Sequence, residues 1–433
     1  MAEKQERNRG PQTGKHSIKL AMALSVIPGL GQLYNRRFIK GALFFTLFLS
    51  FFILFADFLN IGYWGLVTLG TWVGVDDSRA LLIQGIVSVI LTFFFILFYW
   101  MNFSDARSDA NRLRDGWRIT TIRSGFKEAW DKGVPYLFIG PGIFMMMFVL
   151  ILPLLFMVSL AFTNYNIYNS PPRFLLDWVG FDNFKSIFSV PIWRNTLISV
   201  LSWTLVWTFV ATTLQISLAL FLAVIVNDKR VKFKRFIRTM LILPWAVPSF
   251  VSILVFAALF NDRFGAVNRT ILSPFNVSIP WMTDPFWTKV AIIIVQVWLG
   301  FGFVFALFTG VLQSISSDWY EAAEVDGASK WQRFRQITLP HILFATAPLL
   351  IMQYTGNFNN FNLIYLFNQG GPPIRNQTAG SSDIIISWVY KLTFETLNYN
   401  MAAVISIILG LTVATVAFFQ FRRTRSFKEE GKI

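Results

Sequence analysis

Several runs of apolar residues in this chain are long enough to cross a lipid bilayer, and they limit its possible folds more than any other feature. A helix needs about 20 apolar residues to cross the hydrocarbon core. Of the 433 residues, 55% are hydrophobic and only 14% are charged, which leaves too little polar surface for a soluble protein of this size. The sequence therefore predicts an all-α polytopic membrane protein. Eight spans are expected, at residues 41–59, 80–103, 136–162, 196–226, 239–260, 289–312, 343–366 and 400–421.

Basic residues gather in alternate connecting segments. Five of these segments hold 29 of the 38 lysines and arginines, and the outer segments and span edges hold the other nine. This asymmetry predicts that both termini lie in the cytoplasm. The net charge of +15 is then explained by topology and by attraction to the lipid surface, so binding to nucleic acid is not expected. The five segments are 1–40, 104–134, 227–238, 313–342 and 422–433.

The spans and the basic segments together predict the domain organisation. The region 20–34 is apolar but is broken by Pro28, Gly29 and Gly31, which favours an interfacial or re-entrant helix over a span. Aromatic residues alternate with arginines in the linker 104–134, which favours an amphipathic helix on the inner leaflet. The predicted parts are a basic cytoplasmic tail with the interfacial segment (1–40), a two-helix transmembrane extension (41–103), a cytoplasmic linker (104–134), a transmembrane core (135–421) and a cytoplasmic tail (422–433).

The sequence offers no residues for covalent or metal chemistry. It contains no cysteine, which excludes disulfides and thiolate metal sites, and its two histidines, His16 and His341, are isolated. The phosphate-binding pattern GxxxxGK[ST] is absent as well. We therefore expect no enzyme activity, no catalytic residue, no metal and no cofactor bound by this chain.

A short polar segment between two predicted spans, residues 321–340, has the properties of a docking element. A short helix is expected from Glu321 to Asp326, capped by Ser317 or Asp318, and its two alanines would let another protein approach closely. Gly327 permits a left-handed helix end, so the chain can reverse into a second, basic helix at 329–337. This pattern predicts a rigid helix–turn–helix that projects from the membrane.

Amide side chains lie within the predicted span 343–366. Gln353, Asn357 and Asn360 share one helix face, and Asn359 and Asn362 form a neighbouring stripe. Amides are costly in a membrane and usually face the interior of a bundle. They could bind the hydroxyl groups of a sugar, with nearby aromatic rings against the pyranose faces, or they could simply hydrogen-bond neighbouring helices. Spacing alone leaves both alternatives open.

The polar segment resembles the EAA loop of ATP-binding-cassette (ABC) importer permeases. The resemblance implies a type I importer permease fold with the coupling loop at 313–342, which would dock into a groove on a separate ATPase. Its coupling residues would be Glu321, Ala322, Ala323, Gly327, Leu339 and Pro340.

The sequences NFNNF at 357–361 and NQGGP at 368–372, with the apolar segment 297–312, resemble the MalF-type permeases of maltose and maltodextrin importers. Phe303 stands where the family has tyrosine, and Gly356 where it has phenylalanine, so a wider site suited to longer oligosaccharides is expected. The residues implied to contact the sugar are Leu299, Gly300, Phe303, Gly356, Asn357 and Asn360.

The resemblance also implies partners and a location. They are a second, MalG-type permease, two ATPase subunits that carry ATP and magnesium, an extracellular sugar-binding protein, an oligosaccharide substrate and the lipid of a bacterial plasma membrane. Two alternatives stay open: the same importer for galacto-oligosaccharides or another sugar, and an ion-coupled secondary sugar transporter. The second would normally show ionisable residues inside the spans, where this sequence has few.

Overall fold

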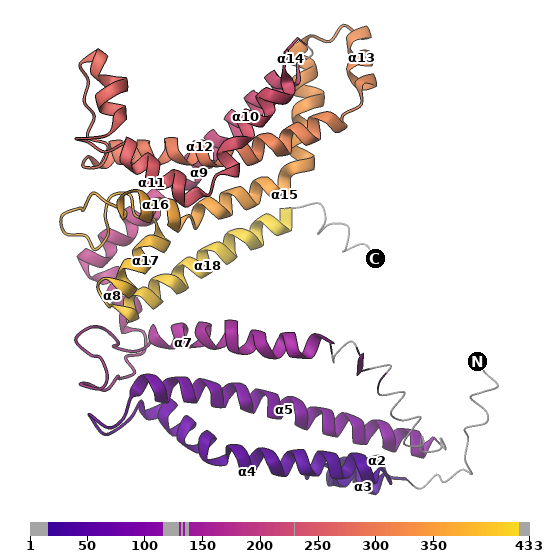
Figure 1. The fold of residues 1–433 in the computed structure, drawn as a ribbon. Coiled ribbons are helices and arrows are strands. Elements are labelled where there is room, and N and C mark those ends of the chain that lie inside the picture. Colours follow the sequence, from indigo (N-terminus) through magenta and orange to yellow (C-terminus); the bar gives the residue numbers. More distant parts are fainter. Residues whose placement is uncertain (1–15, 116–129, 131–132, 135–137, 229, 424–433) are drawn as a thin grey trace. The chain divides into compact units, whose positions relative to one another are not determined.

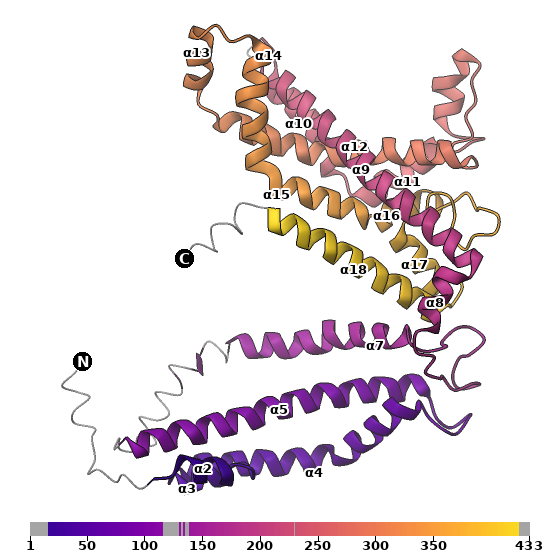
Figure 2. The ribbon, with the colours of Figure 1, turned by 180° about the vertical axis from the view of Figure 1, so that it is seen from behind.

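Helices make up the regular structure of this chain. The computed structural model describes residues 16–115, 130, 133–134, 138–228 and 230–423, and within these ranges the only extended pairings are the isolated bridges Thr163–Trp178 and Pro373–Gly380. Figures 1 and 2 show the helices from two opposite sides. The chain divides into two compact units, Met1–Gly180 and Phe181–Ile433. The prediction of an all-α polytopic membrane protein is confirmed.

Two long helices form an antiparallel hairpin in the first unit, α4 (Phe38–Thr68) and α5 (Ser78–Arg114). Glycines bring them close together: a Cβ atom on Gly62 would lie 2.1 Å from the hydroxyl oxygen of Ser88, and one on Gly85 would lie 2.6 Å from the Cβ of Leu66. Small residues at such contacts allow the backbones of membrane helices to approach closely and to gain van der Waals contact.

The rest of the first unit consists of shorter elements. The broken segment 20–34 folds as two short helices, α2 (Ile18–Leu24) and α3 (Leu30–Tyr34). A span at Phe138–Leu160 contains a π-helical turn, η1 (Met147–Ile151), followed by α7 (Leu152–Leu160). The amphipathic helix expected within 104–134 falls mostly outside the described residues, although α5 itself continues to Arg114.

The second unit is built around two packed helices, α9 (Pro191–Asn227) and α12 (Pro285–Ser314). Their shared core includes the buried side chains Trp207, Ile292 and Val295. The remaining elements, in chain order, are α8 (Asp182–Ser189), α10 (Lys234–Ala246), α11 (Ser249–Leu259), η2 (Val267–Leu272), η3 (Ser273–Phe275), α13 (Ser317–Val325), α14 (Lys330–Arg333), η4 (Phe334–Thr338), α15 (Leu339–Phe358), α16 (Phe361–Asn368), α17 (Ile385–Phe394) and α18 (Tyr399–Arg423).

The number of continuous spans differs from the expected eight. Six helices of the described chain are long and apolar enough to cross a membrane, and a seventh span results if α10 and α11, which bend by 89° at their junction, are taken together. The predicted span 239–260 is broken there because Pro248 cannot continue the helix. The predicted span 400–421 lies within α18, whose sequence is predominantly apolar as far as Phe421.

A buried ion pair organises the loop between α16 and α17. The carboxylate of Asp383 is fully buried and accepts hydrogen bonds from the ammonium of Lys391 (2.6 Å), the backbone N–H of Gly380 (2.7 Å) and the hydroxyl of Ser387 (2.8 Å). Burial raises the pKa of Asp383, and Lys391 acts in the opposite direction. The loop is joined to α9, because the indole N–H of Trp203 donates to the carbonyl of Ser382 (3.1 Å).

We expect Lys391→Met to destabilise the protein by about 3 kcal/mol or more, because it leaves the buried carboxylate of Asp383 without its cation. The double variant Asp383→Asn/Lys391→Met should recover much of this loss. Thermal unfolding of the purified protein, followed by size-exclusion chromatography, measures both effects. The matched control is Lys185→Met, which removes an exposed pair with Asp182 and should have little effect. An unchanged unfolding temperature for Lys391→Met would contradict the structural role of this pair.

Candidate functional site

The bend between α10 and α11 forms one wall of a cavity. Pro244 lies in the last turn of α10, and Val247 and Pro248 are extended before α11 begins. A broken helix exposes backbone groups that must face protein or water rather than lipid. Trp245 and Ser249, on either side of the break, line a cavity of about 430 Å³.

Two further walls complete this amide-lined cavity. Helix α12 contributes apolar groups, and the ring of its Phe303 lies 5.6 Å from the ring of Trp245 of α10. The segment from α15 to α16 contributes amides, and among these the side chain of Asn362 is exposed. The lining thus combines flat apolar groups with hydrogen-bonding groups, as polar-ligand sites usually do. The full lining is Trp245, Ser249, Ile253, Gln296, Leu299, Gly300, Phe303, Gln353, Asn360 and Asn362.

A chain of hydrogen-bonded amides connects the cavity with the core, and Gln215 of α9 is its centre. The Oε1 atom of Gln215 accepts from Gln296 Nε2 (3.0 Å) and from Asn357 Nδ2 (3.4 Å), while its own Nε2 donates to Gln353 Oε1 (3.0 Å). Gln296 Oε1 in turn accepts from Asn360 Nδ2 at 2.8 Å. Each buried amide satisfies its neighbour, so the network holds α9, α12 and α15 in one register.

Gly300 allows this network to form. A Cβ atom at this position would lie 2.1 Å from Gln215 Oε1 and 2.6 Å from its Cδ. Gln215 is fully buried and hydrogen-bonded at both ends, so its side chain has little freedom to move away. The absence of a side chain on Gly300 therefore leaves the space that the amide of Gln215 needs.

The structure places four of the six proposed sugar-contacting residues in the cavity lining, namely Leu299, Gly300, Phe303 and Asn360. Asn357 lies elsewhere: it is 4% exposed, its side-chain amide donates to Thr212 Oγ1 (2.8 Å), and its backbone carbonyl accepts from the indole N–H of Trp207 (2.9 Å).

Gly356 is exposed but does not line the cavity, and a Cβ atom there would meet nothing within 4 Å. Gln215 and Gln296 are not among the site residues expected from the sequence. Each is an amide inside a long apolar helix, which is the same signal that pointed to Gln353.

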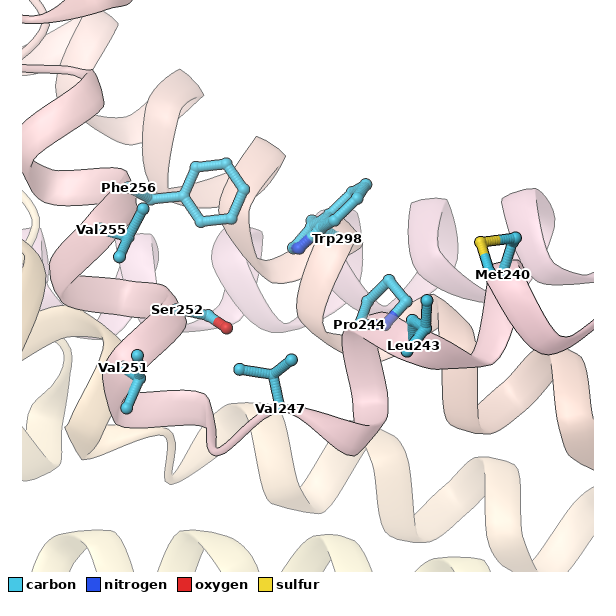
Figure 3. Close-up of a pocket in the computed structure, with 9 residues that line it drawn as sticks. All are labelled: Met240, Leu243, Pro244, Val247, Val251, Ser252, Val255, Phe256 and Trp298. Carbon is cyan, nitrogen blue, oxygen red and sulfur yellow. The ribbon is translucent and has the colours of Figure 1, made fainter.

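A second cavity, of about 520 Å³, lies on α10, α11 and α12 (Figure 3). Ser252 and the indole N–H of Trp298 are its polar side-chain groups, and the other lining residues are apolar. It offers few partners for a hydroxylated ligand, so the amide-lined cavity is the better candidate for a polar ligand. The lining residues are Met240, Leu243, Pro244, Val247, Val251, Ser252, Val255, Phe256 and Trp298.

The polar segment between α12 and α15 forms a projecting pair of short helices (Figure 2). Helix α13 begins at Ser317, four residues before the expected start, because Ser316 caps it by accepting from the N–H of Asp318. Gly327 has φ of 78° and reverses the chain. A capping box between Ser329 and Gln332 then starts α14.

Two contacts stiffen this helix pair. Arg333 forms an ion pair with Glu324 at 2.9 Å, and the hydroxyls of Tyr320 and Thr338 lie 2.8 Å apart. Glu321, Ala322 and Gly327 are exposed, Ala323 is half-buried, and Leu339 and Pro340 begin α15.

A polar cavity of about 510 Å³ lies between this loop and the end of α9, and Glu321 and Asp228 line it. The backbone N–H of Arg230 lowers the pKa of Asp228, as do nearby cations that include Lys330, so this carboxylate is charged at neutral pH. Within the described ranges no group of three potential metal-ligating side chains occurs.

Comparison with known proteins agrees with this architecture. Residues 215–426 match the family described as binding-protein-dependent transport system inner membrane component. A galactooligosaccharides transport system permease protein of Bacillus subtilis is 51% identical over 95% of this chain and 99% of its own length. A maltodextrin transport system permease protein of Bacillus subtilis is 46% identical over 94% of this chain and 96% of its own length. Another, of Streptococcus pneumoniae, is 43% identical over 98% of this chain and 99% of its own length.

Solved structures show the same fold. A bacterial ABC transporter involved in alginate import aligns with a TM-score of 0.56 at 23% identity, covering 69% of this chain and 99% of the other. The chain is thus a multi-pass membrane permease, and it belongs to the family of binding-protein-dependent transport system inner membrane components. Within that family it is a permease subunit of a sugar ABC importer, and not an enzyme.

We expect Gly300→Ala to disrupt the amide network, because the new methyl group would overlap the side chain of Gln215. Overpacking of this kind should destabilise the protein by about 1–3 kcal/mol and reduce transport. Gly310→Ala, on the same helix, is the matched control, since a Cβ atom there meets nothing within 4 Å. Its unfolding temperature should stay the same or rise. Equal behaviour of the two variants in thermal unfolding would show that the close approach at Gly300 is unimportant.

Proposed function

We propose that this chain forms half of the translocation path of an ATP-driven importer for malto-oligosaccharides. The observation that carries the proposal is the amide-lined cavity at the broken helix. Amides of Gln353 and Asn362 can donate to and accept from sugar hydroxyls, and the rings of Trp245 and Phe303 offer flat apolar surface to a pyranose. The relatives named for maltodextrin transport support the same substrate class.

The proposed contacts divide into two groups. Leu299, Phe303 and Asn360 would touch the sugar directly, since they line the cavity. Asn357 would act through the network in this conformation, because its amide is occupied by Thr212 and Gln215. Gly356 lies outside the cavity in this conformation, so the hydroxyl that Phe303 lacks is the departure that leaves more room for a chain of several sugar units.

Galacto-oligosaccharides are the second candidate substrate, because the Bacillus subtilis relative named for them is 51% identical to this chain. Gluco- and galacto-pyranoses carry the same set of hydroxyl groups and differ in the orientation of one. The amide-lined cavity can satisfy either orientation, because an amide both donates and accepts.

The projecting loop would transmit force to an ATPase. Glu321, Ala322, Ala323 and Gly327 would sit in the ATPase groove, and Leu339 and Pro340 would join the loop to α15. The ion pair of Glu324 with Arg333 and the hydrogen bond of Tyr320 with Thr338 connect the two arms of the loop, which supports a role in transmitting a movement.

The proposed complex contains a second, MalG-type permease, two ATPase subunits that bind ATP and magnesium, and an extracellular sugar-binding protein. The related alginate transporter has been solved with a periplasmic protein that carries an alginate pentasaccharide, which supports the last partner. Both termini of this chain would be cytoplasmic. ATP binding would shift the bundle between inward-facing and outward-facing states.

Uptake by the reconstituted complex tests the substrate. We expect ATP-dependent accumulation of labelled maltotriose, and a fall of about fivefold in its apparent affinity in Asn360→Ala through the loss of a hydrogen-bonding amide. Labelled galactotriose is measured in parallel. Uptake of galactotriose alone would exclude the malto-oligosaccharide assignment and keep the importer. Uptake that needs an ion gradient but no ATP would favour the ion-coupled alternative.

Coupling is tested by Glu321→Ala in the same complex. Loss of a charged group from the docking surface should lower sugar-stimulated ATP hydrolysis and uptake together by about tenfold or more. Asp326→Ala, which removes another exposed carboxylate of the same loop, is the matched control and should retain both activities. Full stimulation of ATP hydrolysis in Glu321→Ala would contradict the proposed role of this glutamate.

A further inference from the structure

The segment that joins α2 and α3 is held on α5 by the buried amide of Asn102 and by the hydroxyl of Tyr99, which donates to the carbonyl of Val26. Asn102 of α5 accepts a hydrogen bond from the backbone N–H of Gly29 (3.2 Å) and donates one to the carbonyl of Ser25 (2.9 Å). The backbone carbonyl of Asn102 accepts from the side chain of Gln32 at 3.0 Å. Asn102, Ser25 and Gln32 are fully buried. Residues 18–37, named here the N-terminal clip, are therefore an ordered part of the first unit.

Glycines set the shape of the N-terminal clip. Gly29 has φ of 95°, and a Cβ atom there would lie 2.2 Å from the carbonyl oxygen of Gly41. A Cβ atom on Gly31 would lie 1.9 Å from the hydroxyl oxygen of Ser25. The Pro-Gly-Leu-Gly sequence thus permits a tight turn that presses against the start of α4.

Two acidic residues at this end of the hairpin form ion pairs with basic residues of the same unit. Asp105 pairs with Lys40 at 2.7 Å, and Asp109 pairs with Arg37 at 3.2 Å and with Lys40 at 3.6 Å. The carboxylates therefore neutralise cations of the same unit and contribute little negative charge to the surface.

Three other cations at the same end remain on the surface. Lys19, Arg36 and Arg107 are exposed, and none of them forms an ion pair within the described part of the chain. The result is a positive surface at one end of a pair of membrane-spanning helices.

Exposed apolar side chains accompany these cations. Val26 is 59% exposed, Ile27 is 46% exposed, and Phe38 at the start of α4 is 68% exposed. Apolar side chains beside exposed lysine and arginine are the pattern of a segment that lies in the membrane–water interface, with the apolar groups among acyl chains and the cations at the headgroups.

We propose that the N-terminal clip and Arg107 form a binding surface for anionic phospholipid headgroups. Lys19, Arg36 and Arg107 would bind the phosphates of the lipids, while Val26, Ile27 and Phe38 would enter the acyl region. Each cation near an anionic membrane surface strengthens binding by about fivefold. The surface depends on the chain spanning a membrane and is independent of which sugar the importer carries.

The test compares phosphatidylglycerol with phosphatidylcholine. The full-length protein is placed in nanodiscs of phosphatidylcholine alone or with phosphatidylglycerol, and hydrogen exchange of residues 18–40 is measured. Native mass spectrometry after detergent extraction counts each lipid retained. We expect stronger protection in phosphatidylglycerol and preferential retention of that lipid. Both should be lost in Lys19→Gln/Arg36→Gln/Arg107→Gln, with a fall of about fivefold in preference per cation removed.

The matched control is Arg194→Gln/Arg263→Gln/Arg375→Gln, which removes three exposed arginines of the second unit and should keep the lipid preference of the wild type. Inorganic phosphate at constant ionic strength should not displace the lipid. Equal retention of the two lipids by the wild type would overturn the proposal, as would a triple variant of the clip that keeps the preference. Selective displacement by phosphate would show a site for a free anion instead of a membrane surface.

Discussion

The need to satisfy polar groups inside a membrane shapes the second unit. An amide among apolar helices gains stability only when its donor and acceptor both find partners. Gln215 meets this need with three amides from two other helices, and those contacts hold α9, α12 and α15 together. The same network leaves Gln353, Asn360 and Asn362 at the cavity, where a ligand with many hydroxyl groups can reach them.

A glycine and a proline shape the surroundings of this network. Gly300 leaves the volume that the amide of Gln215 occupies, and Pro248 ends a helix where the cavity opens. In the first unit, Gly29 allows the clip to approach the start of α4, and its N–H donates to the side chain of Asn102. In both units a buried amide is paired with a glycine that permits close approach, so the polar contacts and the backbone geometry depend on each other.

The projecting loop and the cavity have different physical requirements. The cavity is built from amides and rings held by buried hydrogen bonds, whereas the loop is exposed and is stiffened by caps, an ion pair and a hydroxyl contact. Helix α15 joins the two, since it begins at Leu339 beside the loop and ends at Phe358 beside the cavity. A movement of the loop can therefore reach the cavity along one helix.

Much of this protein follows from its sequence, because lipid accepts few kinds of structure. The apolar runs predict helical spans, and the polar pattern at 317–340 predicts a helix–turn–helix whose turn is at Gly327. Local patterns could not decide which amides face a ligand. The sequence spacing predicts that Asn357 and Asn360 share one helix face, yet Asn357 bonds to Thr212 in the core while Asn360 lines the cavity. That difference arises because α15 ends at Phe358 and a new helix starts after Asn360, which changes the direction of the chain between the two residues. The partner of each buried amide depends on how distant helices pack, and only the tertiary structure determines that packing.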